Sequence, residues 1–149
     1  MTQEGEKKIA CIEKEGGYVS TPMGDSMRPM LRGKRDSVLV KAVECPIKKG
    51  DVLLYETENG QHVLHRVVRI KQGGYEMRGD NCFAKEPLLT GDRIIGILSG
   101  FWRDGRYFSC REHKGYRFYA WLWTWSFPLR RFLRRVKNGL KRLFGKSHK

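Results

Sequence analysis

Residues 24–31 read Gly-Asp-Ser-Met-Arg-Pro-Met-Leu, a stretch in which a serine follows a Gly-Asp pair and precedes a proline. Gly-Asp pairs form tight turns, and a nearby proline prevents a helix from continuing. We therefore expect Ser26 to lie on a loop with an accessible hydroxyl group. The simplest structural alternative is a serine that only stabilises the turn.

A histidine and two carboxylates follow in separate segments. Residues 63–70 read Val-Leu-His-Arg-Val-Val-Arg-Ile and place His65 on a predicted β-strand. The segment Gly79-Asp80-Asn81 and then Glu86 come later in the chain. If the fold brings them together, a serine, a histidine and a carboxylate make an activated nucleophile. The alternative for His65 is a half-buried structural histidine.

The order and spacing of these segments resemble the type I signal peptidases, serine peptidases that share a fold with the LexA-type repressors. The resemblance spans residues 24–98 and includes Gly50-Asp51 before an apolar strand as well as the Gly79-Asp80-Asn81 segment. Most bacterial members have a lysine base where this chain has His65, so in that respect it resembles the endoplasmic-reticulum type, which uses serine and histidine. The resemblance implies a coiled, partly open β-barrel. It also implies a serine endopeptidase that removes a leader or signal segment from a peptide or protein substrate.

Roles for individual residues follow from the same resemblance. Ser26 would attack the peptide carbonyl, and His65 would act as its general base. The acid that orients the His65 ring stays open between Asp80 and Glu86.

The residues around the serine are expected to form the oxyanion and substrate-binding loop. Family members with a serine at the position of Gly24 use its hydroxyl in the oxyanion hole, so here the hole would rest on backbone N–H groups such as that of Ser26. Asp25 belongs to the same turn, and Met27 and Pro29 are expected to shape the substrate groove. A methionine at such a position also packs into a core by default.

Short β-prone segments separated by glycine-rich turns indicate a mainly β domain built from hairpins. Asn59-Gly60 is a typical hairpin turn. The predicted strands cover residues 18–23, 37–41, 51–56, 62–71, 75–78, 94–98 and 107–110. A short surface helix is expected over residues 4–15, ending at Gly16-Gly17. We expect a catalytic β domain over residues 1–112 and a tail over residues 113–149.

The tail is aromatic at its start and basic towards its end. The aromatic run over residues 118–127 is far shorter than the ~20 residues that span a bilayer. Beyond Pro128, apolar residues recur at helical spacing, and residues 129–149 hold nine Lys or Arg residues and no acid, which predicts a basic amphipathic helix. This helix either packs on the β domain or binds an anionic membrane surface. The membrane hypothesis involves Trp121, Trp123, Trp125, Arg130, Arg131, Arg134 and Arg135.

The predicted location follows from the two ends of the chain. Residues 1–8 are charged and contain no apolar segment, so we expect neither a signal peptide nor an N-terminal anchor. With the C-terminal helix as its membrane contact, the protein is predicted to be cytoplasmic and peripheral on the inner membrane face.

Composition bears on cofactors and partners. The formal net charge is +14, and most of it belongs to the tail. The four cysteines lack CxxC or ligand spacing, so free thiols are expected, with no metal and no cofactor. The alternative function is a non-catalytic peptide-binding or nucleic-acid-associated module with a basic tail. Because no helix-turn-helix pattern precedes the β domain, we expect no nucleic-acid partner.

Overall fold

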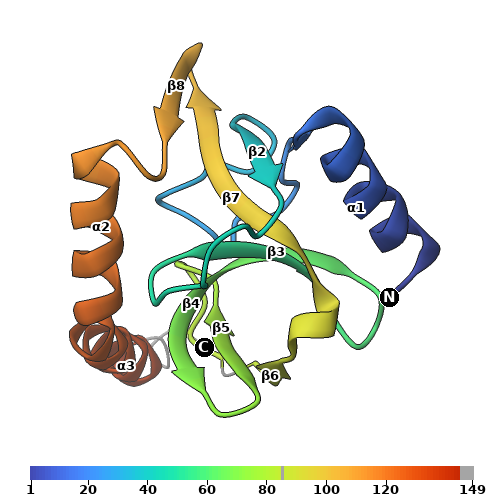
Figure 1. The fold of residues 1–149 in the computed structure, drawn as a ribbon. Coiled ribbons are helices and arrows are strands. Elements are labelled where there is room, and N and C mark those ends of the chain that lie inside the picture. The colour runs from blue at the N-terminus through green and yellow to red at the C-terminus, as the bar shows by residue number, and fades with distance from the viewer. Residues whose placement is uncertain (85, 145–149) are drawn as a thin grey trace.

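The computed structural model describes residues 1–84 and 86–144, with side chains described as far as residue 137. It confirms the predicted mainly β class: an antiparallel eight-stranded sheet curls into a half-barrel, and the three α-helices of the described residues lie outside it (Figure 1). The strands are β1 (Tyr18–Ser20), β2 (Ser37–Lys41), β3 (Val52–Glu56), β4 (His62–Lys71), β5 (Gly74–Arg78), β6 (Leu88–Leu89), β7 (Ile94–Arg103) and β8 (Arg106–Ser109). The helices are α1 (Gln3–Glu15), α2 (Lys114–Trp125) and α3 (Phe127–Phe144), with a short 3-10 turn η1 (Gly91–Arg93).

The sheet is made of sequential hairpins that one long strand joins together. β3, β4 and β5 pair in chain order, and the β3–β4 turn contains Gly60 at φ +73°, a left-handed conformation that glycine adopts readily. β7 lies between β2 and β3, so it connects the strands near the N-terminus to the central hairpin. The full order is β1-β2-β7-β3-β4-β5-β6, with β8 paired to β7.

The strands differ from prediction mainly around β7. This strand continues past Leu98, where the predicted strand ended, to Arg103 and passes through Gly100. The Tyr107 ring of β8 lies directly against Gly100, so that a Cβ there would overlap it. β1 ends at Ser20, earlier than predicted, and the short β6 was not predicted.

Two apolar clusters form the core. The first combines strand residues with Met27, Met30 and Leu31 from the β1–β2 connection, and with Ile12 from α1. Partly buried Tyr116 and Tyr119 of α2 pack against this cluster. The second cluster consists of Leu53, Tyr55, Val67, Met77 and Leu89.

The tail begins with a helix that the sequence did not predict. α2 starts where the His113 side chain accepts a hydrogen bond from the backbone N–H of Tyr116, and Ala120 of this helix is buried. α2 therefore packs on the β domain, on the side opposite α1 (Figure 1). α3 is the helix predicted beyond Pro128. Lys146 and Lys149, two of the nine basic residues counted in the predicted helix, lie outside the described residues.

Candidate active site

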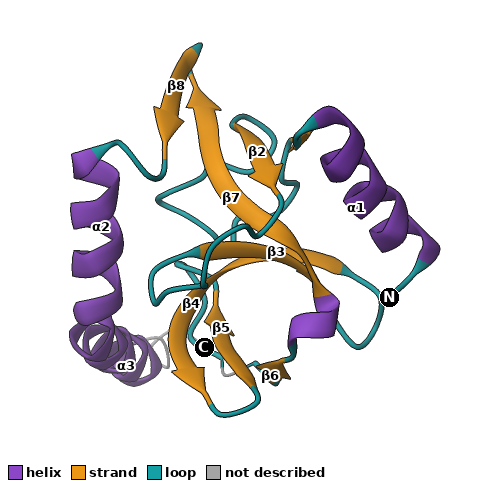
Figure 2. Ribbon diagram, in the orientation of Figure 1, coloured by secondary structure: helices purple, strands orange, loops and turns teal. Residues whose placement is uncertain are grey.

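Ser26 lies on a loop, as predicted. Residues 21–36 connect β1 to β2, drawn as a loop in Figure 2. Met27, Met30 and Leu31 of this connection are buried in the first core, whereas Ser26 itself is partly exposed. The apolar side chains therefore anchor the loop, and the serine remains at its surface.

The other residues predicted around the serine divide into two groups. Gly24, Asp25 and Pro29 are exposed, and a Cβ at Gly24 would meet open space. Met27 is only 3% exposed. Its side chain packs into the core that anchors the loop, as expected by default for a methionine at this position, and its part in shaping a substrate groove stays a prediction.

His65 is buried on β4, and one side of its ring is held by Glu86. Nδ1 of His65 lies 2.6 Å from Oε1 of Glu86. The Tyr55 hydroxyl donates to the other Glu86 oxygen at 2.5 Å and lies 3.2 Å from the same His65 nitrogen. The Glu86 carboxylate therefore bridges a histidine from β4 and a tyrosine from β3.

The charge of Glu86 follows from these contacts. Burial acts to raise the pKa of Glu86, but hydrogen bonds from His65 and Tyr55 outweigh it and leave the pKa below its ordinary value. An ionised carboxylate only accepts hydrogen bonds, so Nδ1 of His65 carries the proton that it donates to Glu86. In the neutral ring, this leaves Nε2 with a free lone pair, as a general base requires.

Nε2 of His65 is buried, and none of the described residues supplies it with a hydrogen-bond partner. A buried nitrogen without a partner is unusual, and such groups often belong to functional sites. Nε2 points at Gly79, where an added Cβ would lie 2.9 Å from it and 2.7 Å from the Ser26 carbonyl oxygen. The Asn81 N–H donates to that same carbonyl at 2.7 Å. The turn after β5 thus brings the backbone of Ser26 next to the free nitrogen of His65.

The side chain of Cys82 also lies close to Gly79. A Cβ added at Gly79 would be 2.9 Å from the Cys82 sulfur. Burial, together with the nearby Glu86 carboxylate, raises the pKa of the Cys82 thiol. A thiol that stays protonated is a poor nucleophile, which lowers the reactivity expected of Cys82.

Asp80, the other carboxylate that the sequence left open, faces a different partner. Its two oxygens accept hydrogen bonds from Arg66 at 2.8 Å each, and one of them also accepts from the Tyr119 hydroxyl at 3.0 Å. Arg66 follows His65 on β4, and consecutive strand residues point to opposite faces of a sheet. Of the two candidates, Glu86 therefore contacts the histidine, and Asp80 forms a buried ion pair on the far side of the strand.

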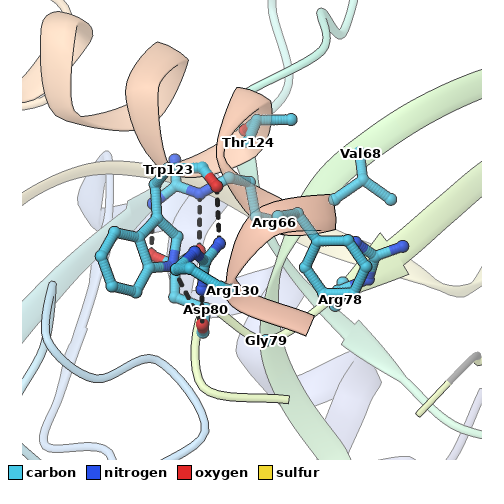
Figure 3. Close-up of a pocket in the computed structure, with 9 residues that line it drawn as sticks. Arg66, Val68, Arg78, Gly79, Asp80, Trp123, Thr124 and Arg130 are labelled. Atoms are coloured by element: carbon cyan, nitrogen blue, oxygen red, sulfur yellow. Dashed lines mark hydrogen bonds and ion pairs between the residues drawn. The ribbon is translucent and has the colours of Figure 1, made fainter. Parts of the chain in front are cut away.

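The backbone of Asp80 is held by the C-terminal helices. Its carbonyl oxygen accepts from Trp123 Nε1 at 2.9 Å and from the Arg130 guanidinium at 3.2 Å. Figure 3 shows Asp80 between Arg66 and these two side chains. Trp123 and Arg130 were predicted to face a membrane; instead they contact the turn that carries Gly79.

Tyr55 is the site residue that the sequence analysis missed. The Asn59-Gly60 turn sets a register in which Tyr55 pairs with Val63 and Leu53 with His65. Tyr55 and His65 are therefore diagonal neighbours on one face of the hairpin, within reach of each other's side chains. The signal that could have found Tyr55 is this hairpin register.

Comparison of the chain with protein-family models gives no match, and comparison with curated proteins gives none either. A functional assignment therefore rests on the arrangement of the chain's own residues. That arrangement is a loop serine, a buried histidine and an ionised glutamate on a curled β-sheet.

Proposed function

We propose that the chain is a serine endopeptidase of the signal-peptidase type, in which Ser26 is the nucleophile, His65 the general base and Glu86 the acid that orients it. One observation carries the proposal: Glu86 occupies Nδ1 of His65, while the buried Nε2 has no partner among the described residues and points at the turn beside Ser26. The serine–histidine mechanism requires a carboxylate that orients Nδ1 and an Nε2 that can take the serine proton, and this arrangement supports both roles.

The proposed reaction begins when the Ser26 oxygen attacks the carbonyl carbon of a bound peptide and its proton passes to Nε2 of His65. The tetrahedral intermediate then collapses, the C–N bond breaks, and the leaving amine takes the proton from His65. Water then attacks the acyl-enzyme as His65 takes one of its protons. The bond between the acyl carbon and the Ser26 oxygen breaks, and His65 returns the proton to that oxygen. Throughout, the Glu86 carboxylate stabilises the imidazolium that forms twice in the cycle.

The contact between Ser26 and His65 forms with substrate. In the free protein Nε2 has no hydrogen-bond partner within the described residues, so the Ser26 hydroxyl is not bonded to it. Catalytic hydrogen bonds are often long in free enzymes and shorten when substrate excludes water. The mechanism requires the Ser26 hydroxyl to come within hydrogen-bond distance of Nε2.

The substrate class comes from the resemblance of residues 24–98 to signal peptidases. We propose that the substrate is a leader or signal segment of a peptide or precursor protein. The negative charge on the tetrahedral oxygen would be stabilised by backbone N–H groups of the serine loop, because Gly24 supplies no hydroxyl.

Active-site acylation tests this function. The full chain is incubated with a penem or a fluorophosphonate, and intact-mass analysis counts the bound label. Wild type is expected to take one label, Ser26→Ala none, and His65→Ala to react about 10²–10⁴-fold more slowly. Ser20→Ala and His62→Gln are matched controls on β1 and β4, and Cys82→Ala excludes labelling of the neighbouring thiol; all three should react as wild type does.

Two results would overturn the proposal. One is wild type that stays unlabelled while an active signal peptidase reacts in parallel, which would favour a non-catalytic peptide-binding domain. The other is Ser26→Ala that is labelled at the wild-type rate, which would place the nucleophile elsewhere.

A further inference from the structure

The apolar face of α3 points away from the protein. Four side chains at helical spacing form this face and are largely exposed: Leu129 at 58%, Phe132 at 61%, Leu133 at 55% and Val136 at 43%. An amphipathic helix normally buries such a face against the core. Here the helix contacts the β domain through other residues, since Phe127 stacks on Phe83 and Arg130 reaches Asp80.

α2 has a second set of exposed apolar side chains. Its exposed apolar residues are Phe118, Trp121, Leu122 and Trp125, again at helical spacing. The rings of Trp121 and Trp125 stack at 6.2 Å, and Phe118 lies 6.0 Å from Trp121. We call these eight residues of α2 and α3 the apolar stripe.

Positive charge surrounds the apolar stripe. In the sequence, residues 113–144 contain no Asp or Glu, and the exposed cations beside the stripe include Arg117, Arg131, Arg135 and Lys137. Trp121 and Trp125 also form one wall of a groove of about 820 Å³ between α2 and the β2–β3 connection. Further cations line that groove, namely Lys41, Lys48, Lys49 and Arg111, together with Glu44 and Asp51.

An exposed surface that is both apolar and basic restricts its partner. A second copy of the chain would bring like charges together, which is unfavourable at an interface. Nucleic acid would pair with the cations but would leave the Leu, Phe and Val side chains in water. An anionic bilayer suits both the charged and the apolar side chains, because its headgroups attract the cations and its acyl chains bury the apolar side chains.

We propose that the apolar stripe of α2 and α3 is a docking surface for an anionic lipid bilayer. No helix among the described residues is long and apolar enough to cross a bilayer, so α3 would lie in the plane of the interface. The indoles of Trp121 and Trp125 suit the headgroup level. This surface differs from the membrane-binding residues predicted from the sequence. It excludes Trp123 and Arg130, which face Asp80, and it includes the aliphatic and phenylalanine side chains of the stripe.

The docking surface is connected to the candidate active site. The opposite face of α2 holds Asp80 through Tyr119 and Trp123, and Asp80 directly follows Gly79. A bilayer-bound α2 would therefore hold the turn beside His65 at a defined distance from the membrane surface. This inference does not depend on the peptidase proposal, because acylation in solution tests Ser26 without any lipid.

Vesicle co-sedimentation of the full chain tests the docking surface. Vesicles contain either phosphatidylcholine alone or equal parts of phosphatidylcholine and phosphatidylglycerol. Wild type is expected to bind the anionic vesicles at least ~10-fold more tightly, since several cations near such a surface are attracted to its headgroups. Tryptophan fluorescence should shift to shorter wavelength on binding, because Trp121 and Trp125 leave water.

Two variants separate the apolar and the basic contributions. Phe132→Ser/Leu133→Ser should weaken binding by at least ~10-fold, whereas Val19→Ser/Ile70→Ser, which alters exposed apolar residues of β1 and β4, should bind as wild type. Arg131→Glu/Arg135→Glu should abolish the preference for anionic vesicles. Its control is Lys7→Glu/Lys14→Glu, the same charge change on exposed residues of α1. All the altered side chains are at least partly exposed, so circular dichroism should show wild-type folding.

The proposal is overturned if wild type does not sediment with anionic vesicles. It is also overturned if Phe132→Ser/Leu133→Ser and Arg131→Glu/Arg135→Glu both bind as their controls do. Analytical ultracentrifugation that shows a dimer abolished by Phe132→Ser/Leu133→Ser would assign the surface to a second copy. Salt-sensitive binding to duplex DNA without vesicle binding would assign it to nucleic acid.

Discussion

Oε1 of Glu86 lies 2.6 Å from Nδ1 of His65. His65 belongs to β4 and Glu86 to the loop after β5, so a whole strand separates the two residues along the chain. The contact occupies one nitrogen of the ring and leaves the other free. It turns a buried histidine into a candidate general base beside the Ser26 loop.

Replacing Glu86 by glutamine should slow acylation of Ser26 by about 10²–10⁴-fold. An amide at this position can donate to Nδ1, so the ring is no longer held in the tautomer that frees Nε2. The rate of label incorporation measures the effect, with Glu58→Gln, an exposed position, as the control. Wild-type kinetics for Glu86→Gln would show that Glu86 does not orient the base.

The lowered pKa of Glu86 predicts that the stability of the fold depends on pH. Hydrogen bonds from His65 and Tyr55 hold the pKa of Glu86 below its ordinary value against the opposing effect of burial. A carboxylate of this kind stabilises the fold above its unfolded-state pKa of about 4.3, and the contribution is lost as pH falls through the lower folded value. The free energy of unfolding of wild type, measured relative to Glu86→Gln, should be constant above about pH 5.5 and decrease below the unfolded-state pKa. A difference that does not change down to acid unfolding would contradict the assignment.

Gly79→Ala should reduce the acylation rate by about 100-fold. Its methyl group would lie 2.7 Å from the Ser26 carbonyl oxygen and 2.9 Å from Nε2 of His65, so the loop and the ring must move apart. Gly91→Ala is the matched control, because a Cβ there meets no atom within 4 Å. Equal rates for the two variants would mean that the turn at Gly79 does not set the geometry of the site.

Asp80→Asn should act on stability. The change leaves the Arg66 guanidinium, which is 1% exposed, without its charged partner, and breaking such a buried pair costs about 3–5 kcal/mol. Urea unfolding measures the loss, and Asp92→Asn, at an exposed position, should change stability far less. Under conditions in which Asp80→Asn remains folded, it should still be acylated, which distinguishes it from Glu86→Gln.

Gly24→Ser should increase the acylation rate at least ~10-fold. Members of the signal peptidase family, which the sequence resembles, can have a serine hydroxyl in the oxyanion hole at this position, and one such donor is worth about 10²–10³ in rate. The structure has room for the side chain, since a Cβ at Gly24 meets no atom within 4 Å. Gly91→Ser controls for the added hydroxyl, and an unchanged or lower rate for Gly24→Ser would place the oxyanion elsewhere.

Local sequence patterns predicted much of the β domain because hairpin turns and strand alternation depend on neighbouring residues. The strands over residues 37–41 and 62–71 have the predicted bounds, and Ser26 lies on the predicted loop. The end of β7 was not predictable in this way. Gly100 stays within the strand because Tyr107, on the next strand, covers it.

The amino-acid sequence alone determined the mainly β class, the loop position of Ser26 and the strand position of His65. The tertiary structure decided that Glu86 contacts His65 while Asp80 contacts Arg66, and that Trp123 and Arg130 face inward while Trp121 and Trp125 remain exposed. Alternation along β4 separates His65 from Arg66 to opposite faces, but it does not indicate which loop or helix covers each face. That choice depends on long-range packing of the turn after β5 and of α2, to which residues distant in the chain contribute.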